Sequence, residues 1–115
     1  MYEKRKFANH TKQIRPNRDI AEVSATDHIK SFTSTGFTLG TGGDANSSGN
    51  TYVAWCWKAS NESTINQEGS ITSIVSANPA AGFSIVNYTG TGVSNATVGH
   101  GLTDIELVIC RSAST

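Results

Sequence analysis

The sequence predicts an all-β fold, and three observations lead to that prediction. Serine, threonine, asparagine and glycine supply 48 of the 115 residues, a composition that suits exposed strand faces and tight turns and disfavours helices. The eleven glycines recur along the chain at spacings typical of a backbone that repeatedly reverses direction. Between these turns lie short apolar segments with a two-residue period. A chain of this length predicts a single domain spanning residues 1–115.

The first third of the chain carries the weakest strand signals. Pro16 prevents a long regular element there, and Asp19–Val23 is compatible with one short helical turn. The apolar residues are widely spaced among polar ones, so we expect short strands and irregular loops. These apolar residues are Ile14, Ile20, Val23, Ile29 and Phe32.

Charge and hydropathy limit the partners that this chain can have. Residues 1–18 form a basic arm with six cations and one anion, whereas residues 19–115 carry three cations and eight anions. Such an arm contacts either nucleic acid or an acidic neighbouring subunit, or it is a solvated strand edge whose cations discourage aggregation. We favour the solvated edge, because the arm lacks the interleaved aromatic residues that single-strand binders use. We expect no nucleic-acid partner, because the net charge of the chain is zero. No apolar run reaches the length of a bilayer span and no signal sequence is present, so we expect a soluble protein with no membrane partner.

The strongest strand signal lies near the middle of the chain. Phe37–Leu39 is a short strand, and Gly40–Asn50 has neither helical nor strand character. Thr51–Lys58 reads T-Y-V-A-W-C-W-K, and its two alternating sets of side chains are both apolar. This pattern predicts a central strand that is covered on both faces or lies against a partner chain.

Four further segments complete the strand pattern. Ser70–Ser76 is the first, Phe83–Tyr88 follows Gly82, and Thr97-Val98 and Glu106–Cys110 come last. About six strands after residue 36, separated by turns, are typical of an antiparallel β-sandwich.

No set of residues predicts catalysis, a cofactor or a metal. The carboxylates show no pairing that suggests glycosidase chemistry, and the Gly-rich loop lacks the Lys-Ser/Thr of a phosphate-binding loop. Cys56 and Cys110 lie far apart in apolar runs and are interpreted as buried thiols. Asp44, Asn46 and Asn50 supply oxygen atoms that suit calcium. Their spacing is not that of a helix–loop–helix calcium site, so we expect no metal.

Four residues are candidates for contact with a glycan or a partner protein: Trp55, Trp57, Tyr88 and His100. The aromatic residues would suit a sugar-stacking platform. Large aromatic residues also dominate burial in small sandwiches, so we interpret the two tryptophans as core. His100 lies between two glycines in V-G-H-G-L and is interpreted as a turn residue whose ring bonds to a nearby carbonyl. A general base or a ligand contact is the alternative.

Two blocks of the sequence resemble segments that recur in predicted virion proteins of marine phages, particularly phages of cyanobacteria. Residues 31–59 contain S-F-T-S-T-G-F-T-L-G and N-S-S-G-N-T-Y-V-A-W-C-W-K-A, and residues 81–102 contain A-G-F-S-I-V-N-Y-T-G-T-G and A-T-V-G-H-G-L, followed by E-L-V-I-C-R-S-A-S. They look like a repeated domain of unknown function in tail-fibre and other structural proteins. The resemblance implies a lectin-like sandwich of jelly-roll, concanavalin or laminin-G type, and it carries over no catalytic residues.

The order of the two blocks differs from the order in that family. The block that closes a repeat comes first in this chain, and the block that opens one comes last. Thr103-Asp104-Ile105 replaces a Gly-rich turn with proline, and Tyr2–Ile14 resembles a degraded version of the middle of the repeat. We therefore interpret the chain as a frame-shifted repeat. Its C-terminal strands complete a sandwich begun either by its own N-terminal half or by the N-terminal half of a neighbour.

The leading functional hypothesis is a non-enzymatic protein of the bacteriophage virion. It would be a fibre, appendage or capsid-decorating subunit that packs against other virion proteins, against copies of itself and against the host surface. One alternative is a carbohydrate-binding module that uses its surface aromatics on host glycans. Another is a fragment of a glycan-cleaving tail spike, which needs two carboxylates facing each other across a groove.

Overall fold

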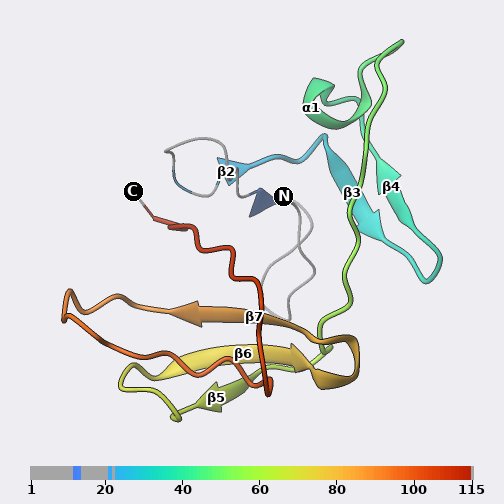
Figure 1. Ribbon diagram of the computed structural model, residues 1–115. Helices are drawn as coiled ribbons and strands as arrows, with labels where there is room; N and C mark the ends of the chain where they lie inside the picture. Colours follow the sequence, from blue (N-terminus) through green and yellow to red (C-terminus); the bar gives the residue numbers. More distant parts are fainter. Residues whose placement is uncertain (1–11, 14–20, 22, 115) are drawn as a thin grey trace. The chain divides into compact units, whose positions relative to one another are not determined.

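The computed structural model describes residues 12–13, 21 and 23–114. The chain divides into two compact units, one made of Met1–Ala54 with Ile109–Thr115 and the other of Trp55–Val108. Every pairing between the strands is antiparallel, and helix is limited to two short segments among the described residues (Figure 1). The all-β prediction is confirmed.

The first unit contains two small sheets. Strand β1 (Lys12–Gln13) pairs with β2 (Val23–Ser24), and β3 (Ile29–Phe32) pairs with β4 (Phe37–Leu39). The turn between β3 and β4 forms because the Thr33 hydroxyl accepts a 2.9 Å hydrogen bond from the Gly36 N–H, which is a local bond that favours turns over continued strand. A single helical turn, α1 (Gly43–Asn46), follows β4.

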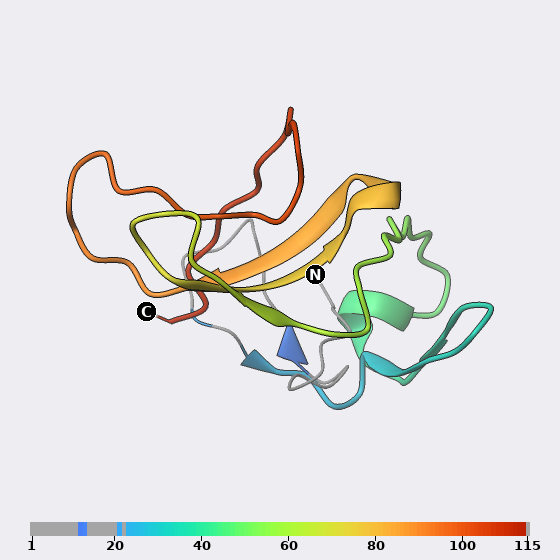
Figure 2. The ribbon, with the colours of Figure 1, turned by 90° about the horizontal axis from the view of Figure 1, so that it is seen from below.

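The second unit contains a three-stranded sheet. Its order is β5 (Thr64–Asn66), β6 (Ser73–Asn78) and β7 (Phe83–Tyr88), so β6 lies in the middle (Figure 1). The short helix η1 (Pro79–Ala81) connects β6 to β7, and Figure 2 shows the twist of this hairpin. The turn ends at Gly82, whose φ of 64° lies in the left-handed region that glycine adopts without strain.

The strand predictions are correct for part of the chain. Phe37–Leu39 and Phe83–Tyr88 are strands with the predicted bounds, and the strand predicted at residues 70–76 is present slightly later as β6. Strand β5 was not predicted, because Thr64–Asn66 contains one apolar residue and shows no alternation. In the described residues, four strands follow residue 36, and three precede it, which differs from the predicted six and their predicted concentration.

Two of the predicted strands are wrong. Thr51–Lys58 and Glu106–Cys110 belong to no strand, and Thr97-Val98 contributes only an isolated bridge between Val98 and Ile71. Alternating apolar residues favour an extended backbone, but a β-strand also needs a neighbouring strand with which it can form hydrogen bonds. Among the described residues, residues 53–57 make no backbone hydrogen bond.

Three further expectations concern less regular parts of the chain. The segment predicted as plain loop, Gly40–Asn50, contains α1, so that prediction is wrong. Much of Asp19–Val23 lies outside the described residues, and Val23 itself begins β2 rather than ending a helical turn. Ile14 and Ile20 also lie outside the described residues.

The arrangement of the sheets as a sandwich stays a prediction. In the described residues, no helix is long and apolar enough to cross a bilayer.

Candidate functional site

The three-stranded sheet has two faces whose residues follow from its register. Paired residues of antiparallel strands point to the same side, and successive residues point to opposite sides. Strand pairing therefore divides the side chains into two sets. We call one set the covered face, which consists of Thr64, Asn66, Ser73, Val75, Ala77, Ser84, Val86 and Tyr88. We call the other set the open face, which consists of Ile65, Ile74, Ser76, Asn78, Phe83, Ile85 and Asn87.

The covered face is closed by the segment from Val98 to Leu102. Ser73 is only 1% exposed and Val75 only 3%. The Ser73 hydroxyl donates a 3.1 Å hydrogen bond to the carbonyl oxygen of Gly99. A Cβ atom on Gly101 would lie 3.0 Å from Ala77 Cβ and 3.1 Å from Val75 Cγ1. Glycine therefore lets the backbone approach the sheet closely enough to exclude water from Val75.

A second set of bonds fixes the start of this covering segment. The backbone N–H groups of Ser70 and Thr97 each donate to the other residue's hydroxyl at 2.9 Å, and the Ile71 N–H donates to the Thr97 carbonyl at 2.9 Å. Gly69 lies against this junction, where a Cβ atom would come within 2.4 Å of the Thr97 carbonyl oxygen. The segment is therefore held by backbone geometry as well as by apolar contact.

The open face is largely exposed at the β5 side. Ile65 is 72% exposed and its register partner Ile74 is 48% exposed. Both residues are β-branched and suit a sheet that is buried on that side. Their exposure leaves an apolar surface that would gain free energy from being covered.

The other end of the open face is lined by residues 57–60. The Trp57 ring stacks on Phe83, with centroids 5.8 Å apart and an interplanar angle of 13°. The Asn78 amide nitrogen donates to the Lys58 carbonyl at 3.1 Å, and the Ser76 hydroxyl donates to the Ser60 carbonyl at 2.8 Å. Trp57 is therefore held in one orientation, although it is 57% exposed.

The prediction that both tryptophans are core is wrong. Trp55 is 79% exposed, and Trp57 is also exposed apart from its contact with Phe83. The thiols of Cys56 and Cys110 are exposed as well, so the prediction that they are buried is wrong. The physical reason is the same in each case, because these residues lie in extended segments that belong to no sheet.

A second exposed apolar segment lies near the C-terminus. Leu107, Val108 and Ile109 follow one another, and all three side chains are exposed. The described backbone there belongs to no strand. Consecutive large apolar residues exposed to water are costly, so covering this segment would also gain free energy.

Tyr88 and His100 do not join Trp57 in one site. Tyr88 is half exposed and belongs to the covered face by register, whereas Trp57 stacks on the open face. The Nδ1 atom of His100 accepts a 3.1 Å hydrogen bond from the Leu102 N–H. The turn interpretation of His100 is therefore supported, but its ring bonds to an N–H group rather than to the carbonyl that was predicted.

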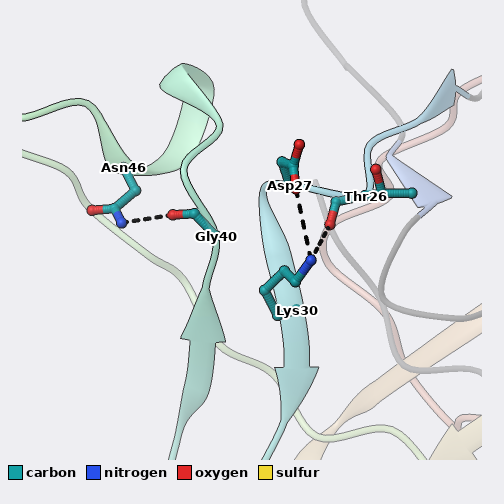
Figure 3. Close-up of polar contacts among 5 residues, drawn as sticks. All are labelled: Thr26, Asp27, Lys30, Gly40 and Asn46. Atoms are coloured by element: carbon teal, nitrogen blue, oxygen red, sulfur yellow. Dashed lines mark hydrogen bonds and ion pairs between the residues drawn. The ribbon is translucent and has the colours of Figure 1, made fainter.

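The loop that carries the calcium candidates is bonded internally. The Asn46 amide nitrogen donates a hydrogen bond to the Gly40 carbonyl at 2.7 Å (Figure 3). Nearby, Lys30 Nζ donates a hydrogen bond to the Thr26 carbonyl at 3.1 Å and forms an ion pair with Asp27 at 3.7 Å. Asp44 lies in the first turn of α1, and the Asn50 N–H donates to the Ser47 carbonyl. Within residues 23–114, no cluster of three or more His, Cys, Asp or Glu side chains could hold a metal ion.

Tyr52 anchors the same loop through its hydroxyl. The hydroxyl donates to the Gly43 carbonyl at 2.8 Å and accepts from the Ser47 N–H at 2.9 Å. The bond from the Ser47 N–H favours the ionised phenolate and lowers the pKa of Tyr52 from its ordinary value. Tyr52 therefore orders the backbone around α1.

The second unit is acidic around its sheet. It contains one cation, Lys58, and four anions, Glu62, Glu68, Asp104 and Glu106. Glu62 and Glu68 lie on either side of β5 and are exposed. The Glu68 carboxylate accepts a 3.2 Å hydrogen bond from the Asn66 amide. In the part of the chain that the structure describes, none of these four carboxylates forms an ion pair.

Comparison with known proteins identifies a family but not a function. A family model described as a domain of unknown function (DUF7483) matches residues 6–115. No curated protein and no solved structure matches the chain. Because the matched residues cover almost the whole sequence, the chain belongs to the DUF7483 family.

Proposed function

We propose that this protein is a non-enzymatic structural subunit that acts by packing against other protein chains. The observation that carries this proposal is the imbalance between buried and exposed apolar side chains. Among the described residues, the buried apolar side chains are those of Ala25, Ile29 and Val75. Fourteen large apolar side chains in the same part of the chain are exposed.

That imbalance has a physical consequence. Small domains are marginally stable even with a complete core, and those with too little core depend on oligomerisation, disulfides or metals. Apolar surfaces of this kind are typical of protein interfaces. The exposed segments at residues 53–57 and 107–109 and the open face of the sheet are the surfaces that neighbouring chains would cover.

The virion is the assembly that we propose. The two sequence blocks that resemble phage tail-fibre and structural proteins support this location, and the exposed apolar segments suit a fibre, appendage or capsid-decorating subunit. In such an assembly, the unpaired segments would complete a sandwich of the jelly-roll or concanavalin-like type with strands of a neighbour.

Immunogold labelling of purified particles of the virus that encodes the chain tests this proposal. Antibodies against the protein should label a repeated position on intact particles, and mass spectrometry of the particles should find the protein in many copies. If the protein is present in infected cells but missing from purified particles, the structural role in the virion is wrong.

Binding of host-surface glycans is the second candidate function. Trp57 supports it, because one side of its ring is fixed on Phe83 while 57% of the side chain is exposed. The C–H edges of a sugar ring carry partial positive charge and pack against the negative face of an aromatic ring. Titration with cellotetraose and chitotetraose, followed by tryptophan fluorescence, should then show saturation that Trp57→Ala abolishes and Trp55→Ala leaves in place. Absence of saturation for the unsubstituted protein would reject this candidate.

A further inference from the structure

We infer that the β5 edge of the open face is the docking site for a second copy of this chain, which contributes the part of its basic N-terminal arm that precedes β1, residues 1–11. This inference rests on the proposed packing function and names the surface and its partner. Among the described residues, strand β5 has a neighbour on one side only, because it pairs with β6 and ends the sheet. An edge strand presents backbone groups that another chain can bond.

The β5 edge combines an apolar centre with acidic ends. Ile65 lies in the middle of the strand and is 72% exposed. Glu62 lies three residues before it and Glu68 three residues after it, and both are exposed. Among the described residues, neither carboxylate is in an ion pair. A partner that fits this edge is therefore apolar in its middle and cationic around it.

The arm of a second copy has this composition. Residues 1–11 contain the three cations Lys4, Arg5 and Lys6 and one anion, and Phe7 directly follows those cations. The unit that carries β5 has four anions and one cation. Opposite charges of this kind set the orientation of an interface and speed association more than they tighten it, whereas covering Ile65 and Ile74 supplies the apolar contribution.

The same charge pattern favours protein over nucleic acid as the partner of the arm. The acidic remainder of the chain would repel a phosphate backbone that approached the arm.

The contact would also be heterologous, because the arm of one copy meets the β5 edge of another. Heterologous contacts build rings or open fibres rather than closed two-fold dimers, which suits a repeated virion component.

A charge-swap experiment on the full chain tests this inference. One variant carries Lys4→Glu, Arg5→Glu and Lys6→Glu, and the other carries Glu62→Lys and Glu68→Lys. A matched control carries Asp104→Lys and Glu106→Lys, which changes the net charge by the same amount as the β5 swap but away from β5. Sedimentation velocity at low salt measures association, and circular dichroism checks that each variant keeps its strands.

We expect the unsubstituted protein to associate and each charge-swap variant alone to associate at least about tenfold more weakly. An equimolar mixture of the two variants should recover association, because each reversed arm then meets a reversed edge in another chain. The control should associate as the unsubstituted protein does, and added salt should weaken association.

Several outcomes would overturn the inference. Association that neither charge swap weakens would place the interface elsewhere and leave the structural role standing. Competition by a 30-base-pair DNA duplex, with no effect of the β5 swap, would assign the arm to nucleic acid. If antibodies locate the protein on virus particles but the purified protein stays monomeric, this inference is wrong. If the protein is absent from the particles, the structural role itself is wrong.

Discussion

The two faces of the β5–β6–β7 sheet differ in what covers them. On the covered face, Val75 is 3% exposed beneath the glycine-containing segment at residues 98–102. On the open face, the adjacent residue of the same strand, Ile74, is 48% exposed, and its partner Ile65 is 72% exposed. Both faces carry β-branched apolar residues. The chain therefore covers one face and leaves the β5 side of the other face exposed.

This difference shows which part of the stability belongs to the chain alone. Side chains of the covered face contribute to folding within one copy, because their contacts are already complete. Exposed side chains at the β5 side of the open face contribute little until another surface covers them. Substitutions should therefore destabilise a single copy most where the covering segment meets the sheet and least on the open face.

The junction at Gly69 should be the most sensitive position of the covered face. In Gly69→Ala, the new Cβ atom would lie 2.4 Å from the Thr97 carbonyl oxygen and 2.8 Å from Val98 Cα, and both are backbone atoms. We expect the free energy of unfolding to fall by about 3 kcal/mol, measured by urea denaturation with circular dichroism. Gly90→Ala is the control, because a Cβ atom there has nothing within 4 Å. Equal effects at the two positions would show that the close approach at Gly69 is not needed.

Truncation of Val75 should have the next largest effect. Val75→Ala removes two methyl groups from a side chain that is 3% exposed and leaves a cavity beneath Gly101. We expect a loss of about 2 kcal/mol in the free energy of unfolding, measured in the same denaturation experiment. A loss no larger than that of Ile74→Ala would mean that the covered face is not closed in solution.

The Ser73 hydroxyl should contribute less than the Val75 side chain. Ser73→Ala removes the bond to the Gly99 carbonyl at 3.1 Å and leaves that carbonyl unsatisfied. The expected loss in the free energy of unfolding is about 1 kcal/mol. The amide hydrogens of the covering segment, residues 98–102, should also exchange faster in this variant. Unchanged exchange there would show that the Ser73 hydrogen bond does not help to hold this segment on the sheet.

Polar substitutions on the open face should have the smallest effect on folding and a clear effect on assembly. For Ile65→Ser and Ile74→Ser, we expect the free energy of unfolding of the dilute protein to change by less than about 1 kcal/mol each. At higher concentration the same variants should self-associate more weakly in sedimentation velocity. If either variant unfolds as readily as Val75→Ala, the open face is part of the core of one copy.

The sequence predicts the turns and some strands of this molecule better than it predicts their pairing. Phe83–Tyr88 is recognisable because Gly82 supplies a turn and apolar residues alternate after it. Trp55 and Trp57 alternate equally well, yet they are exposed and belong to no strand. Periodicity reports local backbone preference, whereas pairing depends on residues far away in the sequence or in another chain.

The candidate site was only partly predictable for the same reason. Trp57 is a candidate from the sequence alone, but its partner Phe83 is 26 positions away, and no local pattern connects the two. Ile65 was missed, because a strand with one apolar residue gives no periodic signal. The turn at His100 was predicted from its flanking glycines, although the covering role of Gly99 and Gly101 depends on their distance to β6.

Amide hydrogen exchange measured at several protein concentrations tests most directly whether the open face is an interface. We expect protection at β5, residues 64–66, to increase with concentration as neighbouring copies cover that edge. Protection at Ser73 and Val75 should change little, because their face is already closed within the chain. If protection at β5 stays the same from the lowest to the highest concentration, and the protein sediments as a monomer throughout, then the open face is not an interface between copies.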